Sequence, residues 1–210
     1  AAQALGRLTE GNAEFVRRMR TGEVPLSSMN AQPLPEDQHP FAIILGCSDS
    51  RVPAEIVFNQ GLGDLFVIRV AGNIVAPSQV GSVEFAAEQF GTRLVVVLGH
   101  SECGAVAATV AELQAETPNP SPNLRSIVNR IRPSVAELMA SSLREQPQQL
   151  MHQAVRANVR ASVNQLRTGS QSLEQLVLHE GLVIVGAEYS LKTGEVEFFE
   201  GLDELKRMRP

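Results

Sequence analysis

Four short runs of apolar residues constrain the fold of this chain more than any other feature of its sequence. Each run is rich in Val, Ile and Leu and is apolar at successive positions, whereas a strand with one face in water alternates. The runs are FAIILG at 41–46, LFVIRVAG at 65–72, RLVVVLG at 93–99 and LVIVGAEY at 182–189. Strands of this kind are covered on both faces, so we expect them to form the parallel centre of a sheet.

Helical patterns separate these runs. They cover residues 4–19, 53–61, 78–91 and 104–116, and two longer patterns follow the proline-rich segment 117–123. The last segment, EVEFFE at 195–200, follows the turn signal Thr193-Gly194 and is expected to pair antiparallel with the run before it. The sequence therefore predicts a single α/β domain over 1–210. Its mostly parallel central sheet has an antiparallel C-terminal edge strand and flanking helices, and residues 1–35 form an N-terminal helical arm.

Composition excludes several classes of partner. The 210-residue chain has a formal net charge of −5, a pI of about 5.4 and no cluster of Lys and Arg, so nucleic acid or an anionic membrane is not expected to bind. No apolar run approaches the roughly 20 residues needed to cross a bilayer, and no signal-peptide pattern is visible at the start. With its two cysteines interpreted as reduced thiols, the chain is expected in the cytoplasm or another intracellular compartment.

The two cysteines follow two of the apolar runs. Cys47 comes after Gly46, while Gly99 is followed by His100 and then by Cys103. Because the carboxyl ends of parallel strands meet at one edge of a sheet, where ligands bind, these side chains are expected to lie close together. A lone buried Cys is usually just a small apolar residue, and His-x-x-Cys alone is a weak signal. The two patterns together favour a zinc site.

Asp49 and Arg51 are compatible with two forms of a zinc site. If Asp49 is the fourth ligand, the metal is enclosed and the site is structural. If Arg51 instead holds that carboxylate away, zinc keeps a water whose pKa falls to about 7, which makes it a hydroxide nucleophile. Without neighbouring ligands, Asp-Ser-Arg would be interpreted as a turn with a solvated ion pair.

Three segments closely resemble the β-class carbonic anhydrases. They are CSDSRVPAE at 47–55, LFVIRVAGN at 65–73 and GHSECGAV at 99–106, and the likeness extends over nearly the whole chain. The resemblance implies zinc bound by Cys47, His100 and Cys103, and a zinc-bound hydroxide that converts carbon dioxide reversibly to bicarbonate and a proton. Asp49 would either ligate the metal in an inactive form or pair with Arg51 in the active one.

The resemblance also implies a substrate pocket and a homo-oligomer. The pocket positions are Gln38, Phe66, Ala71, Phe85 and Gly104, with the Gln38 amide and the Gly104 N–H facing substrate or bicarbonate. A homodimer or a higher homo-oligomer is expected, with the helix over 4–19 packing on a partner subunit. Some members of the family use a Trp three residues before the first cysteine to bind bicarbonate noncatalytically. This chain has Ile44 there and no Trp, which favours the plant-like, open-shell subgroup.

Two other functions fit the same residues. One is a hydrolase of carbon disulfide or carbonyl sulfide on the same fold, and the other is a noncatalytic zinc-stabilised scaffold closed by Asp49. Arg51 and Gln38 argue against the scaffold, because a closed structural site needs neither. A thiol redox role is disfavoured because Cys-x-x-Cys is absent. As a proton shuttle, His39 beside Gln38 is a weak candidate, and His152 and His179 are interpreted as surface residues.

Overall fold

The computed structural model describes residues 1–22, 36–115 and 121–207 of the chain, and its centre is one sheet of five strands. The strands are β1 (Ala42–Gly46), β2 (Leu65–Arg69), β3 (Leu94–His100), β4 (Val183–Tyr189) and β5 (Val196–Glu200). Their spatial order is β2-β1-β3-β4-β5, and all neighbours are parallel except the antiparallel pair β4 and β5. The predicted α/β fold with an antiparallel C-terminal edge strand is confirmed.

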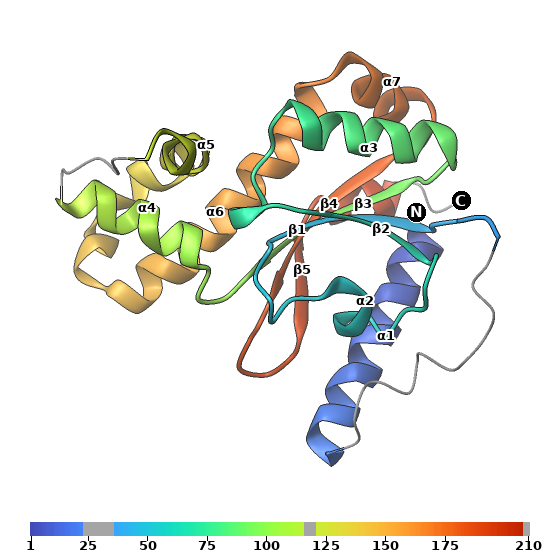
Figure 1. Ribbon diagram of the computed structural model, residues 1–210, viewed down its shortest axis with the longest axis horizontal. Helices are drawn as coiled ribbons and strands as arrows, with labels where there is room; N and C mark the ends of the chain where they lie inside the picture. Colours follow the sequence, from blue (N-terminus) through green and yellow to red (C-terminus); the bar gives the residue numbers. More distant parts are fainter. Residues whose placement is uncertain (23–35, 116–120, 208–210) are drawn as a thin grey trace.

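Helices cover both faces of this sheet (Figure 1). They are α1 (Ala2–Thr21), α2 (Ala54–Val57), α3 (Pro77–Gln89), α4 (Gly104–Ala115), α5 (Pro122–Met139), α6 (Pro147–Thr168), α7 (Gln171–His179) and α8 (Leu202–Arg207), with 3₁₀ turns η2 (Ala71–Asn73) and η3 (Ser142–Glu145). Buried residues of α1, α2 and α8 pack with one set of strand residues, and those of α3, α6 and α7 pack with the other. The central strands β1, β3 and β4 are buried throughout, which is why their sequences do not alternate.

A third apolar cluster lies beyond the sheet, where α4, α5 and α6 come together. It contains both cysteines, together with Val106 of α4, Ile131 of α5 and Val155 of α6. Figure 1 shows α4 and α5 side by side, away from the helices that cover the sheet. The strand ends that carry the cysteines are therefore enclosed by a separate helical layer.

Helix α1 is fixed to its own chain by one buried polar side chain. The Asn12 amide donates to Val57 O at 3.0 Å and to Gly194 O at 2.9 Å, and its oxygen accepts from Val196 N–H at 2.8 Å. Leu8 and Phe15 add apolar contacts on the same side of the helix. Whether this helix also reaches a partner subunit stays a prediction, and residues 23–35 of the predicted arm lie outside the described residues.

The structure differs from the sequence prediction in two details of the helices. Pro53 is the N-cap of α2 rather than its first helical residue, and α2 is only one turn long. The short helix α8 and the turn η3 were not predicted. Of the predicted proline-rich break at 117–123, residues 117–120 lie outside the described residues, and α5 begins at Pro122 after the N-cap Ser121.

Candidate metal centre

The sheet order changes direction at β1, and the candidate ligands gather there. Chain connections run from β1 to β2 on one side, while β3 lies on the other side of β1. Ligands of open α/β sheets bind outside the carboxyl ends of the strands at such a reversal. Cys47 directly follows β1, His100 is the last residue of β3, and Cys103 immediately precedes α4. The predicted placement of these three side chains at one edge is confirmed.

The ligand atoms of Cys47, His100 and Cys103 all lie within 4.8 Å of one another. All three residues are buried, with exposed fractions of 6%, 0% and 1%. Across residues 1–22, 36–115 and 121–207, this is the one group of three or more His, Cys, Asp or Glu side chains placed closely enough to hold a metal ion. Two sulfurs and one imidazole nitrogen are a donor set that suits zinc.

The His100 ring is oriented for metal binding. Its Nδ1 lies 2.8 Å from the carbonyl oxygen of Ser101, which can only accept, so the ring proton belongs on Nδ1. Its Nε2 is buried and has no hydrogen-bond partner among the residues that the structure describes. Burying such a nitrogen without a partner is costly, and a metal ion in the cluster would satisfy it. This orphaned nitrogen is the observation that shows the residues fit a metal.

The thiols share negative charge that a cation could neutralise. A hydrogen bond from Cys103 lowers the pKa of the Cys47 thiol to about 4 despite its burial, and the Gly72 N–H contributes further. The same hydrogen bond and burial raise the pKa of Cys103 far above its ordinary value. The pair therefore holds one proton between its two sulfurs, and metal binding would release that proton.

Asp49 lies beside the cluster and is held by Arg51. Arg51 Nε donates to Oδ1 at 2.9 Å, Nη2 donates to Oδ2 at 2.8 Å, and its backbone N–H donates to Oδ1 at 3.0 Å. These hydrogen bonds from Arg51 hold the pKa of Asp49 well below its usual range, against the effect of burial. Asp49 Oδ2 is 3.9 Å from His100 Nε2. The carboxylate is thus ionised and adjacent to the cluster while its oxygens accept from the guanidinium.

Arg69 holds the backbone of the loop that carries Cys47 and Asp49. Its Nε donates to Cys47 O at 3.1 Å and its Nη2 donates to Asp49 O at 2.5 Å. Arg69 therefore has a structural role in this loop. Gly72, whose N–H donates to Cys47 Sγ at 3.3 Å, was not among the predicted site residues. The Gly-Asn pair at 72–73 is the turn signal that could have indicated it.

The residues predicted to contact substrate fall into three groups. Gly104 and Ala71 adjoin the metal candidates in the chain, at the start of α4 and in η2. Phe66 and Phe85 contact each other, with ring centroids 6.2 Å apart. Gln38 instead lines a cavity of about 740 Å³ near Leu65 and Phe90, and none of the three metal candidates lines that cavity.

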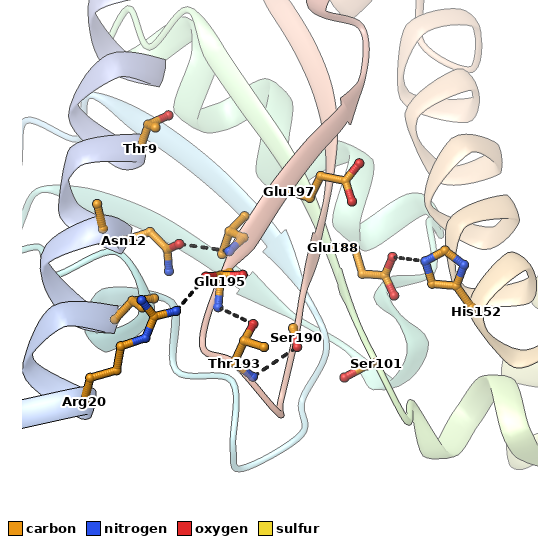
Figure 2. Close-up of a pocket in the computed structure, with 13 residues that line it drawn as sticks. Thr9, Asn12, Arg20, Ser101, His152, Glu188, Ser190, Thr193, Glu195 and Glu197 are labelled. Carbon is orange, nitrogen blue, oxygen red and sulfur yellow. Dashed lines mark hydrogen bonds and ion pairs between the residues drawn. The ribbon is translucent and has the colours of Figure 1, made fainter. Parts of the chain in front are cut away.

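A second cavity, of about 820 Å³, lies between α1 and the β4–β5 hairpin (Figure 2). Ser101, next to His100, is one of its lining residues, but Cys47, His100 and Cys103 are not. His152 and the buried Glu188 also line it, with His152 Nε2 3.4 Å from Glu188 Oε2. His152 is half exposed, as predicted for a surface residue, and its contact with Glu188 was not foreseen.

A mostly parallel sheet with two thiols and an imidazole at its reversal point is the architecture of an α/β protein with a candidate metal site. Comparisons with known proteins identify the family. Residues 42–196 match the family model described as carbonic anhydrase. A carbonic anhydrase of Mycolicibacterium smegmatis is 37% identical over 198 residues, which is 94% of this chain and 93% of the relative. Carbonic anhydrase 2 of Mycobacterium tuberculosis is 37% identical over 187 residues, covering 89% of this chain and 87% of the relative.

Solved structures agree on the fold. The β-carbonic anhydrase CcaA matches with a TM-score of 0.71 at 24% identity, covering 90% of this chain and 89% of that one. A tetrameric β-carbonic anhydrase of Sordaria macrospora matches with a TM-score of 0.69 at 21% identity, covering 89% and 94%. The chain belongs to the carbonic anhydrase family and has the β-class fold. It is an enzyme of reversible carbon dioxide hydration, and neither the sulfur-substrate hydrolase nor the scaffold is favoured.

Proposed function

We propose that this chain hydrates carbon dioxide with a zinc ion held by Cys47, His100 and Cys103, and that Asp49 and Arg51 control the reaction at that ion. The observation that carries the proposal is the orphaned His100 Nε2, which lies with the two sulfurs within 4.8 Å. Zinc bound by three protein ligands supplies a water that is acidic enough to act as a nucleophile near neutral pH.

Asp49 is proposed to orient the nucleophile. Its Oδ2 is near His100 Nε2, so it can accept a hydrogen bond from a water in the open coordination position. Arg51 keeps Asp49 ionised and holds both of its oxygens, which prevents the carboxylate from taking the open position. Asp49 as a fourth ligand remains the alternative for an inactive form, and membership of the open-shell subgroup also remains a proposal.

The substrate pocket is proposed to combine apolar and polar groups. Phe66, Phe85 and Ala71 would surround carbon dioxide, which has no net charge or dipole, while the Gln38 amide and the Gly104 N–H would bind the anionic product. Because Gln38 lines a cavity that none of the three metal candidates lines, we propose that a second subunit supplies Gln38 to the site. This arrangement fits the predicted homodimer or higher homo-oligomer, and the related Sordaria macrospora enzyme is described as tetrameric.

The compartment follows from the thiols. Cys47 and Cys103 are both free and buried, and their role as ligands requires that they stay reduced. We propose that the enzyme works in the cytoplasm or another reducing compartment of the cell. Among the helices that the structure describes, none is long and apolar enough to cross a membrane.

Stopped-flow hydration of carbon dioxide by metal-quantified protein tests the proposal. One zinc per chain and rapid turnover between about pH 6.5 and 9 are expected, since the site is open. Asp49→Ala should keep zinc and lose roughly a hundredfold or more in turnover. Cys103→Ala should lose both metal and stability. Full activity in Asp49→Ala would contradict the role of Asp49, and a zinc-loaded but inactive wild type would favour a sulfur-containing substrate or the scaffold.

A further inference from the structure

The turn η2 presents a hydrogen-bond donor to one of the candidate metal ligands. Gly72 N–H donates to Cys47 Sγ at 3.3 Å, and both groups are buried. Hydrogen bonds to a metal-bound sulfur reduce the electron density that the sulfur gives to the metal. The direction of this N–H therefore affects the metal, although Gly72 is itself no ligand.

That direction depends on an unusual backbone conformation. Gly72 has φ +69° and Asn73 has φ +43°, both in the left-handed region. Asn73 N–H donates to Val70 O at 3.0 Å, which closes the turn, and Val70 N–H donates to Gly46 O at 3.1 Å, which ties the turn to β1. The peptide between residues 71 and 72 is inside this closed turn, and such a peptide can rotate unless the residues after it are held in place.

Helix α6 holds those residues. Asn158 Nδ2 donates to Gly72 O at 2.8 Å, and Ser162 Oγ donates to Asn73 O at 3.0 Å. The two side chains are one helical turn apart and are only 2% and 4% exposed. They are polar residues on a helix face that otherwise buries Val155, Val159 and Val163 in the core. Each donor satisfies one carbonyl of the turn, so that successive peptides are fixed to the helix.

We propose that Asn158, assisted by Ser162, is a positioning residue of the metal centre. By holding the two carbonyls of η2, it fixes the turn in the form whose Gly72 N–H points to Cys47 Sγ. It thereby lowers the electron donation of that sulfur and tightens the geometry of the ligand. The proposal rests on the proposed function, because it requires a metal bound by Cys47.

The test measures metal binding and the electronic state of the sulfur in four variants of the full chain. Asn158→Leu removes the amide donor at similar volume, and Ser162→Ala removes the hydroxyl. Ser162→Thr keeps a hydroxyl as the conservative variant. Val163→Ala is the matched control, because Val163 is equally buried on α6 and packs on the sheet at Gly186, away from η2. Zinc affinity is measured by competition with a chromophoric chelator, and the sulfur-to-cobalt charge-transfer band is recorded after cobalt replaces zinc.

Asn158→Leu is expected to bind zinc about 10- to 100-fold more weakly, the usual effect of losing an outer-shell partner, and Ser162→Ala should show a smaller loss. In both variants the charge-transfer band should move to longer wavelength, because a sulfur without its hydrogen bond gives up electrons more easily. Ser162→Thr and Val163→Ala should keep the affinity and the band of the wild type.

Two results would decide against the positioning role of Asn158. If folded Asn158→Leu keeps the zinc affinity and the charge-transfer band of the wild type, Asn158 has only a structural role. If Val163→Ala changes both as much as Asn158→Leu does, the changes come from a general loosening of α6. If Asn158→Leu does not fold, Ser162→Ala decides by the same two measurements. A wild type that binds neither zinc nor cobalt would instead contradict the proposed function itself.

Discussion

Gly99 allows α6 to lie directly against β3 one residue before His100. A Cβ atom at this position would be 2.5 Å from Val159 Cγ2 and 3.3 Å from Val155 Cγ1. We expect Gly99→Ala to lower the free energy of unfolding by about 1–3 kcal/mol, the usual effect of overpacking a close-packed interior. Urea denaturation measures this, and adding Val159→Ala should recover part of the loss. Equal stability of Gly99→Ala and wild type would show that the helix can shift freely.

Glu188 is a buried carboxylate whose ionisation should make stability depend on pH. Burial raises the pKa of Glu188, although the charges of His152, Arg156 and His100 lower it and Glu197 raises it further. Because the pKa in the folded state is above the unfolded value, the folded chain binds the proton more tightly. The contribution of Glu188 to the free energy of unfolding is therefore fully present below the pKa that it has in the unfolded chain. This contribution is lost as the pH rises through the pKa that it has in the folded chain.

Glu188→Gln should remove that dependence. Relative to wild type, the variant is expected to be more stable at about pH 7.5 than at about pH 4.5, as measured by urea denaturation at both values. Taking the difference between variant and wild type at each pH cancels the titration of groups elsewhere in the chain. A stability difference that is the same at both values would show that Glu188 titrates normally in the fold.

Among the elements, α1 is held to the rest of the subunit by Asn12. Asn12→Ala removes three hydrogen bonds that reach α2 and the β4–β5 hairpin, and it leaves buried peptide groups without partners. We expect the free energy of unfolding to fall by about 3 kcal/mol. Glu10→Ala, at an exposed position of the same helix, should have little effect. If α1 were bound only through a partner subunit, the loss would depend on protein concentration.

The elements were predictable where local sequence dominates. The continuous apolar runs predicted the four parallel strands, and the Thr193-Gly194 turn predicted the antiparallel fifth strand. Both predictions were possible because hydrophobic periodicity and turn-forming residues are properties of a short stretch of sequence. The polar residues inside α6 could not be predicted. Asn158 and Ser162 bond carbonyls 86 and 89 residues earlier in the chain. A polar residue among the buried apolar residues of a helix indicates that it has a hydrogen-bond partner, but only the tertiary structure identifies that partner.

At the scale of the whole molecule, only part of the candidate site could be predicted from the sequence. Cys47, His100 and Cys103 could be placed together because each adjoins the carboxyl end of a strand in one parallel sheet. Gln38 comes before β1 and faces another cavity, so no strand-end argument locates it. The proposed sharing of the site by two subunits would be a property of their arrangement, which the sequence of one chain does not give.

The edge of the sheet at β2 indicates where subunits should meet. Among the strands that the structure describes, β2 has a neighbour on one side only, and most of its residues are only partly buried, in contrast to the buried β1. Beside it, the rings of Phe66, Phe85 and Phe90 contact one another with centroids 5.7–6.2 Å apart, and Phe85 is 51% exposed. An exposed aromatic group next to an open strand edge is typical of an interaction surface.

Phe85→Glu should therefore weaken self-association, because the charge would have to be desolvated in the interface. Sedimentation equilibrium is expected to show a smaller mean mass than for wild type, and carbon dioxide hydration by the wild type should fall on dilution, since the proposed site takes Gln38 from a partner. Leu124→Glu is the matched control: Leu124 is also 51% exposed but lies on α5, at the far end of the molecule (Figure 1). A Phe85→Glu chain that stays assembled would place the interface elsewhere, and an active monomer would remove the need for a second subunit.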